Sequence, residues 1–261
     1  MVAQTNIQLY NQLRAHGMSL EDMLLIRRAY EVNTTLYTGF FQADGKTFVS
    51  HGIGVASVLT EIGQPADVIA FGLLHNVYGN GDFGDHRGPG STPKRRRLVR
   101  DAVGERVELM CERFGQSRVT DRSIDDILAR VDELDEIHRI LAVVDLADTV
   151  EKHADLGCLY YGDGEWVIGE VERAGAKFVK LAGALGEQEL AAMLTESFER
   201  VASETERVPA ELRPPDGQQY AKLVVPRSCR KRREPRYVAT QVRGRLKLRR
   251  RFRAVRTAVA R

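Results

Sequence analysis

Residues 48–62 read FVSHGIGVASVLTEI, and this stretch decides the class of fold. Its large apolar residues recur three or four positions apart, as they do on one face of an α-helix, at Phe48, Val55, Val58, Leu59 and Ile62. Glycine commonly ends a helix, and Gly63 follows the stripe directly. No segment of the sequence sustains the two-residue alternation of a half-buried strand. The sequence therefore predicts an all-α protein.

Helical patterns continue on both sides of this stretch. Ser19 with Asp22 forms a capping pattern that opens a helix through about residue 37. Pro65 suits the first position of the next helix, which carries Val68, Phe71 and His75 on one face. Further helices are expected over residues 92–104, 105–114, 123–153, 165–185 and 187–205, and a glycine-rich loop over 79–90. These patterns predict a helical bundle over residues 1–207.

Composition narrows the class of protein. The chain has 43% hydrophobic and 29% charged residues, which is typical of a globular protein. Residues 1–10 lack the features of a signal peptide, and the apolar run Ile140 to Val144 is far shorter than the roughly 20 residues of a membrane span. Cys111, Cys158 and Cys229 are widely spaced without a CxxC pair. We therefore expect a cytoplasmic protein without a transmembrane segment or disulfides.

Charge is unevenly distributed along the chain. Residues 222–261 hold 16 Lys and Arg against one acidic residue, Glu234, a net of +15. Because the whole chain carries +3, the preceding residues carry −12. We expect residues 208–261 to form a linker and a basic tail that is disordered until a polyanion binds it, either nucleic acid or an anionic membrane surface. A solvated tail, or a tail that contacts the acidic body, is the alternative.

Three ionisable residues lie on predicted apolar helix faces. His51 shares a face with Phe48 and Val55, and His75 lies on the face of the following helix. Asp148 continues the apolar face of the helix expected over residues 123–153. A buried carboxylate or imidazole needs a partner, and a divalent metal held by all three would satisfy them together. The alternative is that each is a hydrogen-bonded core residue.

Four sequence blocks resemble the HD superfamily of metal-dependent phosphohydrolases, in the same order along the chain. The blocks are residues 45–51 (GKTFVSH), 70–77 (AFGLLHNV), 92–114 and 143–148 (VVDLAD). They resemble in particular the hydrolase domain of the bifunctional (p)ppGpp synthetase/hydrolases, over about residues 20–160. The motif Gly-Asp-Phe-Gly at residues 81–84 is similar to an altered branch of that superfamily. The resemblance implies an HD-like helical bundle with a basic C-terminal extension.

When the resemblance is carried over position by position, three residues fall on the metal-ligand positions of the family: His51, His75 and Asp148. Asn76 occupies the fourth ligand position, where the family has Asp, and this difference implies one metal ion instead of two. Other positions also differ from the ppGpp hydrolases. Gly79-Asn80 replace an acidic pair, Lys152 replaces an Asn, and Gln42 replaces an Arg. The resemblance therefore does not imply ppGpp hydrolysis.

We expect a metal-dependent hydrolase that uses Mn, Fe or Zn and acts on a phosphorylated or otherwise anionic small molecule. Asp82 is the candidate base, with a turn-forming role as its alternative, and Asp85, His86 and Asp145 are weaker candidates. Lys94, Arg95 and Lys152 are the candidates for binding the anionic substrate. Two other functions stay open: a catalytically inactive nucleotide-binding, anion-binding or scaffold domain, and a mononuclear iron oxygenase.

Overall fold

The computed structural model describes residues 2–85, 87–160, 164–212 and 222–223, and it is an all-α structure as predicted. Its helices are α1 (Asn6–Ala15), α2 (Leu20–Tyr37), α3 (Phe48–Glu61), α4 (Ala66–Leu74), α5 (Val77–Asn80), α6 (Pro93–Val103), α7 (Glu105–Phe114), α8 (Ile124–Ala129), α9 (Glu136–Ala154), α10 (Gly164–Ala184) and α11 (Gln188–Glu204). Short 3₁₀ turns cover Val131–Glu133, Gly157–Tyr160, Thr205–Arg207 and Ala210–Leu212. In the described residues, the strands are limited to β1 (Phe40–Phe41) and β2 (Lys222–Leu223), with one isolated bridge between Phe41 and Thr47.

Capping residues begin several helices where the sequence predicts them. The Ser19 side chain accepts a hydrogen bond from the backbone N–H of Asp22 at the start of α2. The Thr92 side chain accepts one from the backbone N–H of Arg95 at the start of α6. Gly104 separates α6 from α7 with φ 89°, a left-handed value that favours glycine. These local signals explain why the predicted ends of α2 and α6 are confirmed.

Two predictions about the helices need correction. The single helix expected over residues 123–153 is wrong, because the chain forms α8, a 3₁₀ turn and then α9. Asp135 caps the new start by accepting the N–H of His138, and this capping bond interrupts the helical pattern. The helix α1 was not predicted, although Thr5 and Gln8 form a capping box at its start.

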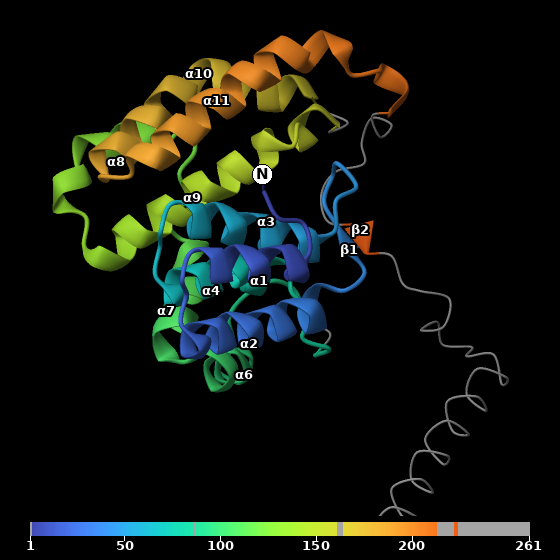
Figure 1. Ribbon diagram of the computed structural model, residues 1–261, viewed down its shortest axis with the longest axis vertical. Helices are drawn as coiled ribbons and strands as arrows, with labels where there is room; N and C mark the ends of the chain where they lie inside the picture. Colours follow the sequence, from blue (N-terminus) through green and yellow to red (C-terminus); the bar gives the residue numbers. More distant parts are fainter. Residues whose placement is uncertain (1, 86, 161–163, 213–221, 224–261) are drawn as a thin grey trace, which may run out of the picture. The chain divides into compact units, whose positions relative to one another are not determined.

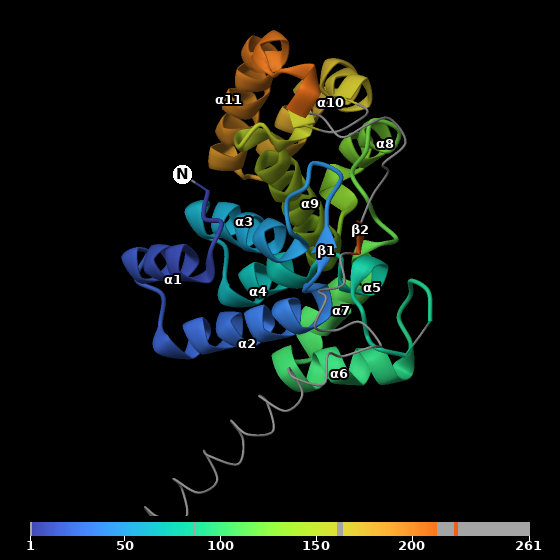
Figure 2. The ribbon, with the colours of Figure 1, turned by 90° about the vertical axis from the view of Figure 1, so that its right-hand side faces the viewer.

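The helix α9 is the centre of the bundle within residues 1–222. It contacts α3, α4 and α7 on one side and α10 and α11 on the other (Figures 1 and 2). The helices α3 and α4 also pack on each other, and α2 packs on α4. The ten consecutive residues of α3 from His51 to Thr60 are all buried, so this helix lies within the core. The three predicted ligand-bearing helices are therefore neighbours.

Glycines allow the close packing of α3. A Cβ added to Gly52 would lie 2.5 Å from Asn33 Nδ2 and 2.8 Å from the Leu73 carbonyl oxygen. A Cβ added to Gly54 would lie 2.5 Å from Glu151 Cγ. Because all three distances are shorter than van der Waals contact, any larger residue at these positions would push α3 away from its neighbours.

The chain divides into two units, Met1–Lys222 and Leu223–Arg261. The predicted basic tail lies outside the described residues, except for 208–212 and 222–223. None of the helices in the described part of the chain combines the length and the apolar content needed to span a bilayer.

Candidate metal centre and cavity

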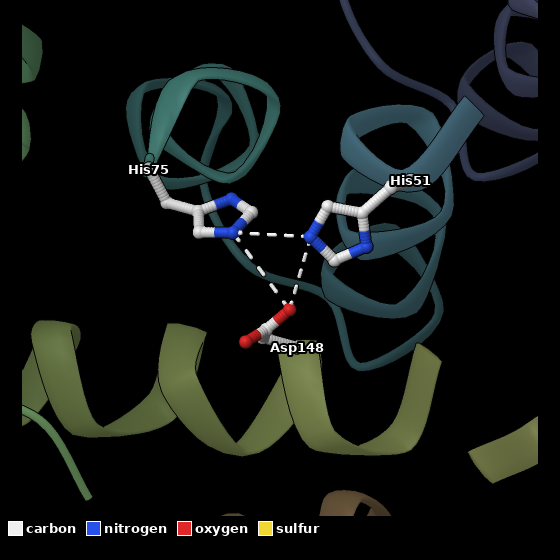
Figure 3. A group of neighbouring side chains, drawn as sticks. All are labelled: His51, His75 and Asp148. Atoms are coloured by element: carbon white, nitrogen blue, oxygen red, sulfur yellow. Dashed lines mark hydrogen bonds and ion pairs between the residues drawn. The ribbon is translucent and has the colours of Figure 1, made fainter. Parts of the chain in front are cut away.

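Three neighbouring helices each contribute one buried polar side chain to a single point. His51 lies in the second turn of α3, His75 follows the last residue of α4, and Asp148 lies in the middle of α9. Their exposed fractions are 1%, 3% and 1%. Figure 3 shows the two imidazoles and the carboxylate pointing toward one another. The sequence-based prediction that these three residues converge is confirmed.

The converging atoms are two imidazole nitrogens and one carboxylate oxygen. His51 Nε2 lies 3.1 Å from Asp148 Oδ1 and 3.3 Å from His75 Nε2. His75 Nε2 lies 3.7 Å from the same Oδ1 atom. One ligand atom from each residue lies within 4.8 Å of the other two, which is the spacing of atoms that share one ion. Asp148 Oδ1 is buried and has no hydrogen-bond partner among the described residues.

Hydrogen bonds on the far side of each ring orient the two imidazoles. His51 Nδ1 lies 2.6 Å from Glu151 Oε2, and His75 Nδ1 lies 2.7 Å from the Gly72 carbonyl oxygen. Both partners only accept hydrogen bonds, so both Nδ1 atoms carry a proton and donate it. When both rings are neutral, the lone pairs of their Nε2 atoms therefore point toward Asp148, as in metal-binding histidines.

The electrostatics of the three residues favour a positive charge between them. Burial disfavours a charged His51, but Glu151 and Asp148 outweigh burial and raise the pKa of His51 to about 9. Burial lowers the pKa of His75 to about 3. Burial also opposes ionisation of Asp148, yet Lys152 and the two histidines hold the pKa of its carboxyl well below the usual value. The arrangement thus attracts one cation, which a proton on His51 or a metal ion can supply.

Asn76 lies beside the centre. It is the residue before α5, and its Nδ2 atom lies 2.7 Å from His75 Nε2. Rotating the amide by half a turn exchanges nitrogen and oxygen, which would present a neutral oxygen ligand. A neutral amide is a weaker ligand for a hard cation than a carboxylate, so the donor set carries the charge of Asp148 alone.

Glu151 and Lys46 extend the centre, and neither was among the predicted site residues. Glu151 is fully buried. It accepts hydrogen bonds from Lys46 Nζ, at 2.6 Å, and from His51 Nδ1. Lys46 also pairs with Asp155. Glu151 lies three residues after Asp148 on α9, so helical periodicity places the two carboxylates on one face. That spacing is the signal that could have identified Glu151.

A cavity of about 300 Å³ adjoins the centre, a volume at the lower end of small-molecule sites. Two cationic side chains, Arg118 and Lys152, line it together with His51, Asn76 and Asp148. The remaining lining residues are Gln42, Ala43, Phe48, Asn80, Val119, Thr120, Asp145, Thr149, His153, Cys158, Glu170, Val171 and Phe178. The cavity therefore combines candidate metal-donor atoms, cations and apolar surface.

Lys152 is the predicted substrate-binding residue that the structure brings to the cavity. Lys94 is exposed, and Arg95 is 3% exposed; neither lines the cavity. The Arg95 guanidinium pairs with both oxygens of Asp85, at 2.6 and 2.8 Å, and donates to carbonyl oxygens of Arg87, Gly88 and Gly90. Arg95 therefore holds the glycine-rich loop together.

The predicted base Asp82 also lies outside the cavity lining. Asp82 is exposed, and its Oδ1 accepts the N–H of Gly84 at 2.8 Å, which is the turn-forming role given as its alternative. Of the weaker candidates, Asp145 lines the cavity, Asp85 pairs with Arg95, and His86 lies outside the described residues.

The comparisons with known proteins assign no activity to these residues. A family model described as a domain of unknown function (DUF6817) matches residues 34–121. The matched segment includes His51, His75, Asn76 and Arg118 and ends before α9, which carries Asp148. None of the curated proteins matches the sequence.

Proposed function

We propose that this protein is a metal-dependent hydrolase of HD-like architecture that acts on a phosphorylated or otherwise anionic small molecule. One observation carries the proposal: His51 Nε2, His75 Nε2 and Asp148 Oδ1 converge, and the carboxylate oxygen is buried without a hydrogen-bond partner among the described residues. An unpartnered buried carboxylate oxygen is costly, and a cation would satisfy it. Two imidazoles and one carboxylate suit Mn, Fe or Zn.

The residues around the cavity support hydrolysis of an anion. When bound, a divalent ion would polarise a phosphoryl oxygen and lower the pKa of a water molecule. The chain itself supplies the orientation of both imidazoles, through Glu151 and the Gly72 carbonyl group. Arg118 and Lys152 supply positive charge for the substrate in the same cavity.

A proton acceptor is also needed, and Glu170 is the candidate for this role. It lines the cavity, and it is the lining carboxylate for which the described residues provide no ion pair. Burial and the nearby Asp121 raise the pKa of Glu170 above its usual value. A carboxylate with a raised pKa is a better base near neutral pH. Asp145 is less suited, because both of its oxygens are engaged by Arg118.

Elemental analysis of the purified full-length protein tests the proposal. We expect about one Mn, Fe or Zn ion per chain in the wild type, and loss of that ion in His75→Ala. The matched control is His16→Ala, because His16 is a histidine that does not line the cavity and is paired with Glu61. Hydrolysis of p-nitrophenyl phosphate should follow the metal content. Wild-type protein without metal, even after incubation with each ion, would refute the proposal.

The second candidate is a binding domain without catalysis. It is favoured by Asn76, which removes the negative charge expected at the fourth ligand position, and by the location of Asp82 outside the cavity lining. This candidate predicts a protein that binds anionic small molecules without metal and without turnover. The same donor set also occurs in mononuclear iron oxygenases, so iron in the elemental analysis would call for a test of oxygen consumption.

A further inference from the structure

Arg118 and Lys152 meet at one oxygen of Asp148. Lys152 Nζ lies 2.6 Å from Asp148 Oδ2, and Arg118 Nη2 lies 3.4 Å from the same atom. The other oxygen, Oδ1, faces the two histidines. The two cations are therefore separated from the candidate metal centre by the width of a single carboxylate, and both line the cavity.

The Arg118 guanidinium is held rigidly. Its Nε atom donates a hydrogen bond to Asp145 Oδ2 at 3.0 Å, and its Nη2 atom forms an ion pair with Asp145 Oδ1 at 2.7 Å. Its central carbon lies 4.7 Å from the centre of the Phe114 ring. No described residue accepts a hydrogen bond from Nη1, and Lys152 Nζ has Asp148 as its one acceptor in the same part of the chain. A fixed guanidinium with spare donors costs little conformational entropy when it binds an oxyanion.

Once a divalent cation is bound, the cavity has a net positive charge that a bound anion would balance. Asp145 and Asp148 balance Arg118 and Lys152 in the protein alone, and Glu170 adds one negative charge to the cavity when it is ionised. A divalent ion on Asp148 would leave an excess of positive charge, which a buried site tolerates poorly without a counter-charge. Burial and Asp121 raise the pKa of Glu170, and with this side chain protonated the excess would be two charges, which a dianion would neutralise more fully than a monoanion.

We infer that Arg118 and Lys152 form an oxyanion site for the tetrahedral dianionic group of a small molecule, next to the metal donors. The metal-dependent part of this inference rests on the proposed function, and the oxyanion site itself does not. Each ligand should strengthen the binding of the other by the same factor, because binding linkage is reciprocal. A coupling of about 5- to 150-fold is usual for linked sites.

Calorimetric titration with methylphosphonate, which cannot be hydrolysed by P–O cleavage, tests the inference on the full chain. The protein is titrated after treatment with EDTA and again with saturating Mn²⁺, and acetate serves as the carboxylate probe. We expect methylphosphonate to bind more tightly with Mn²⁺ and to bind more tightly than acetate. Arg118→Lys keeps a positive charge beside Asp145, and Lys152→Met removes a positive charge near Asp148. Each of the two substitutions should weaken methylphosphonate binding at least about tenfold. Neither change should weaken Mn²⁺ binding, because both cations oppose it.

Lys180→Met is the matched control, because Lys180 is an exposed lysine on α10 that does not line the cavity. Equal methylphosphonate affinity in Lys180→Met, Arg118→Lys and Lys152→Met would overturn the inference, as would tighter binding of acetate. Wild-type protein that binds methylphosphonate through Arg118 but binds none of Mn²⁺, Fe²⁺ and Zn²⁺ would refute the proposed function and leave the oxyanion site supported.

Discussion

Replacing Glu151 by Gln should weaken metal binding through the tautomer of His51. Glu151 accepts two hydrogen bonds, each 2.6 Å long. Its Oε2 atom accepts from His51 Nδ1, and its Oε1 atom accepts from Lys46 Nζ. Both partners are donors in the wild type, whereas an amide has one accepting end and one donating end. A glutamine can therefore satisfy Lys46 with its oxygen only if its NH₂ group donates to His51 Nδ1. That arrangement moves the imidazole proton to Nε2, the atom expected to bind the metal.

The size of the effect follows from burial. His51 and Glu151 are 1% and 0% exposed, so water cannot replace the lost hydrogen bond. Changes to groups that orient metal-binding histidines typically cost 10- to 100-fold in metal affinity, which corresponds to about 1.4–2.8 kcal/mol. We expect the upper end of this range, because the favoured tautomer blocks the ligand atom. The cost in folding should be smaller than the 3–5 kcal/mol of a broken buried ion pair, since Lys46 keeps Asp155 as a partner.

Competition with a fluorescent chelator, with Mn²⁺ or Zn²⁺, measures the affinity, and chemical denaturation checks that the variants fold. The decisive control is the double variant Lys46→Met with Glu151→Gln. Without the ammonium group, the amide oxygen can turn back to His51 Nδ1, so the double variant should bind metal more tightly than Glu151→Gln alone. The reasoning is refuted if Glu151→Gln binds as tightly as the wild type, or if removing Lys46 restores nothing.

Other changes test separate parts of the structure. Asn76→Asp should raise metal content or affinity, measured by elemental analysis, because it restores a charged ligand beside the centre; unchanged metal binding would contradict this. Gly52→Ala should lower the free energy of unfolding by about 1–3 kcal/mol in urea, since its Cβ would lie 2.8 Å from the backbone oxygen of Leu73. Burial lowers the pKa of His153 to about 4, so stability should fall by up to about 3 kcal/mol as the pH drops from about 6.5 toward 4, because the unfolded chain takes up that proton first. His153→Gln should flatten this part of the pH profile. Glu170→Gln should abolish hydrolysis of p-nitrophenyl phosphate while metal content stays the same, and retained hydrolysis would exclude Glu170 as the base.

Local patterns in the sequence predicted most of the helices and the inward positions of the three residues of the candidate metal centre. The apolar stripes of α3 and α4 place His51 and His75 on inward faces, and both histidines are buried. The same periodicity predicts an inward Asp148 on α9. Such predictions depend on residues within a few turns of one another, which is why they can be made from the chain alone. The break at Asp135 was missed because a capping bond can interrupt a helix without disturbing its apolar pattern.

The partners of these residues were decided by the tertiary structure. Lys46 and His51 lie 105 and 100 positions from Glu151 in the chain, and no local pattern connects them. Arg118 reaches Asp145 and Asp148 from the segment after α7, whereas Arg95, in a more basic stretch, is engaged by its own loop. Charge density in the sequence therefore pointed to the wrong arginine for the cavity. Burial and packing between distant helices determine which charges meet, and only the folded chain brings them together.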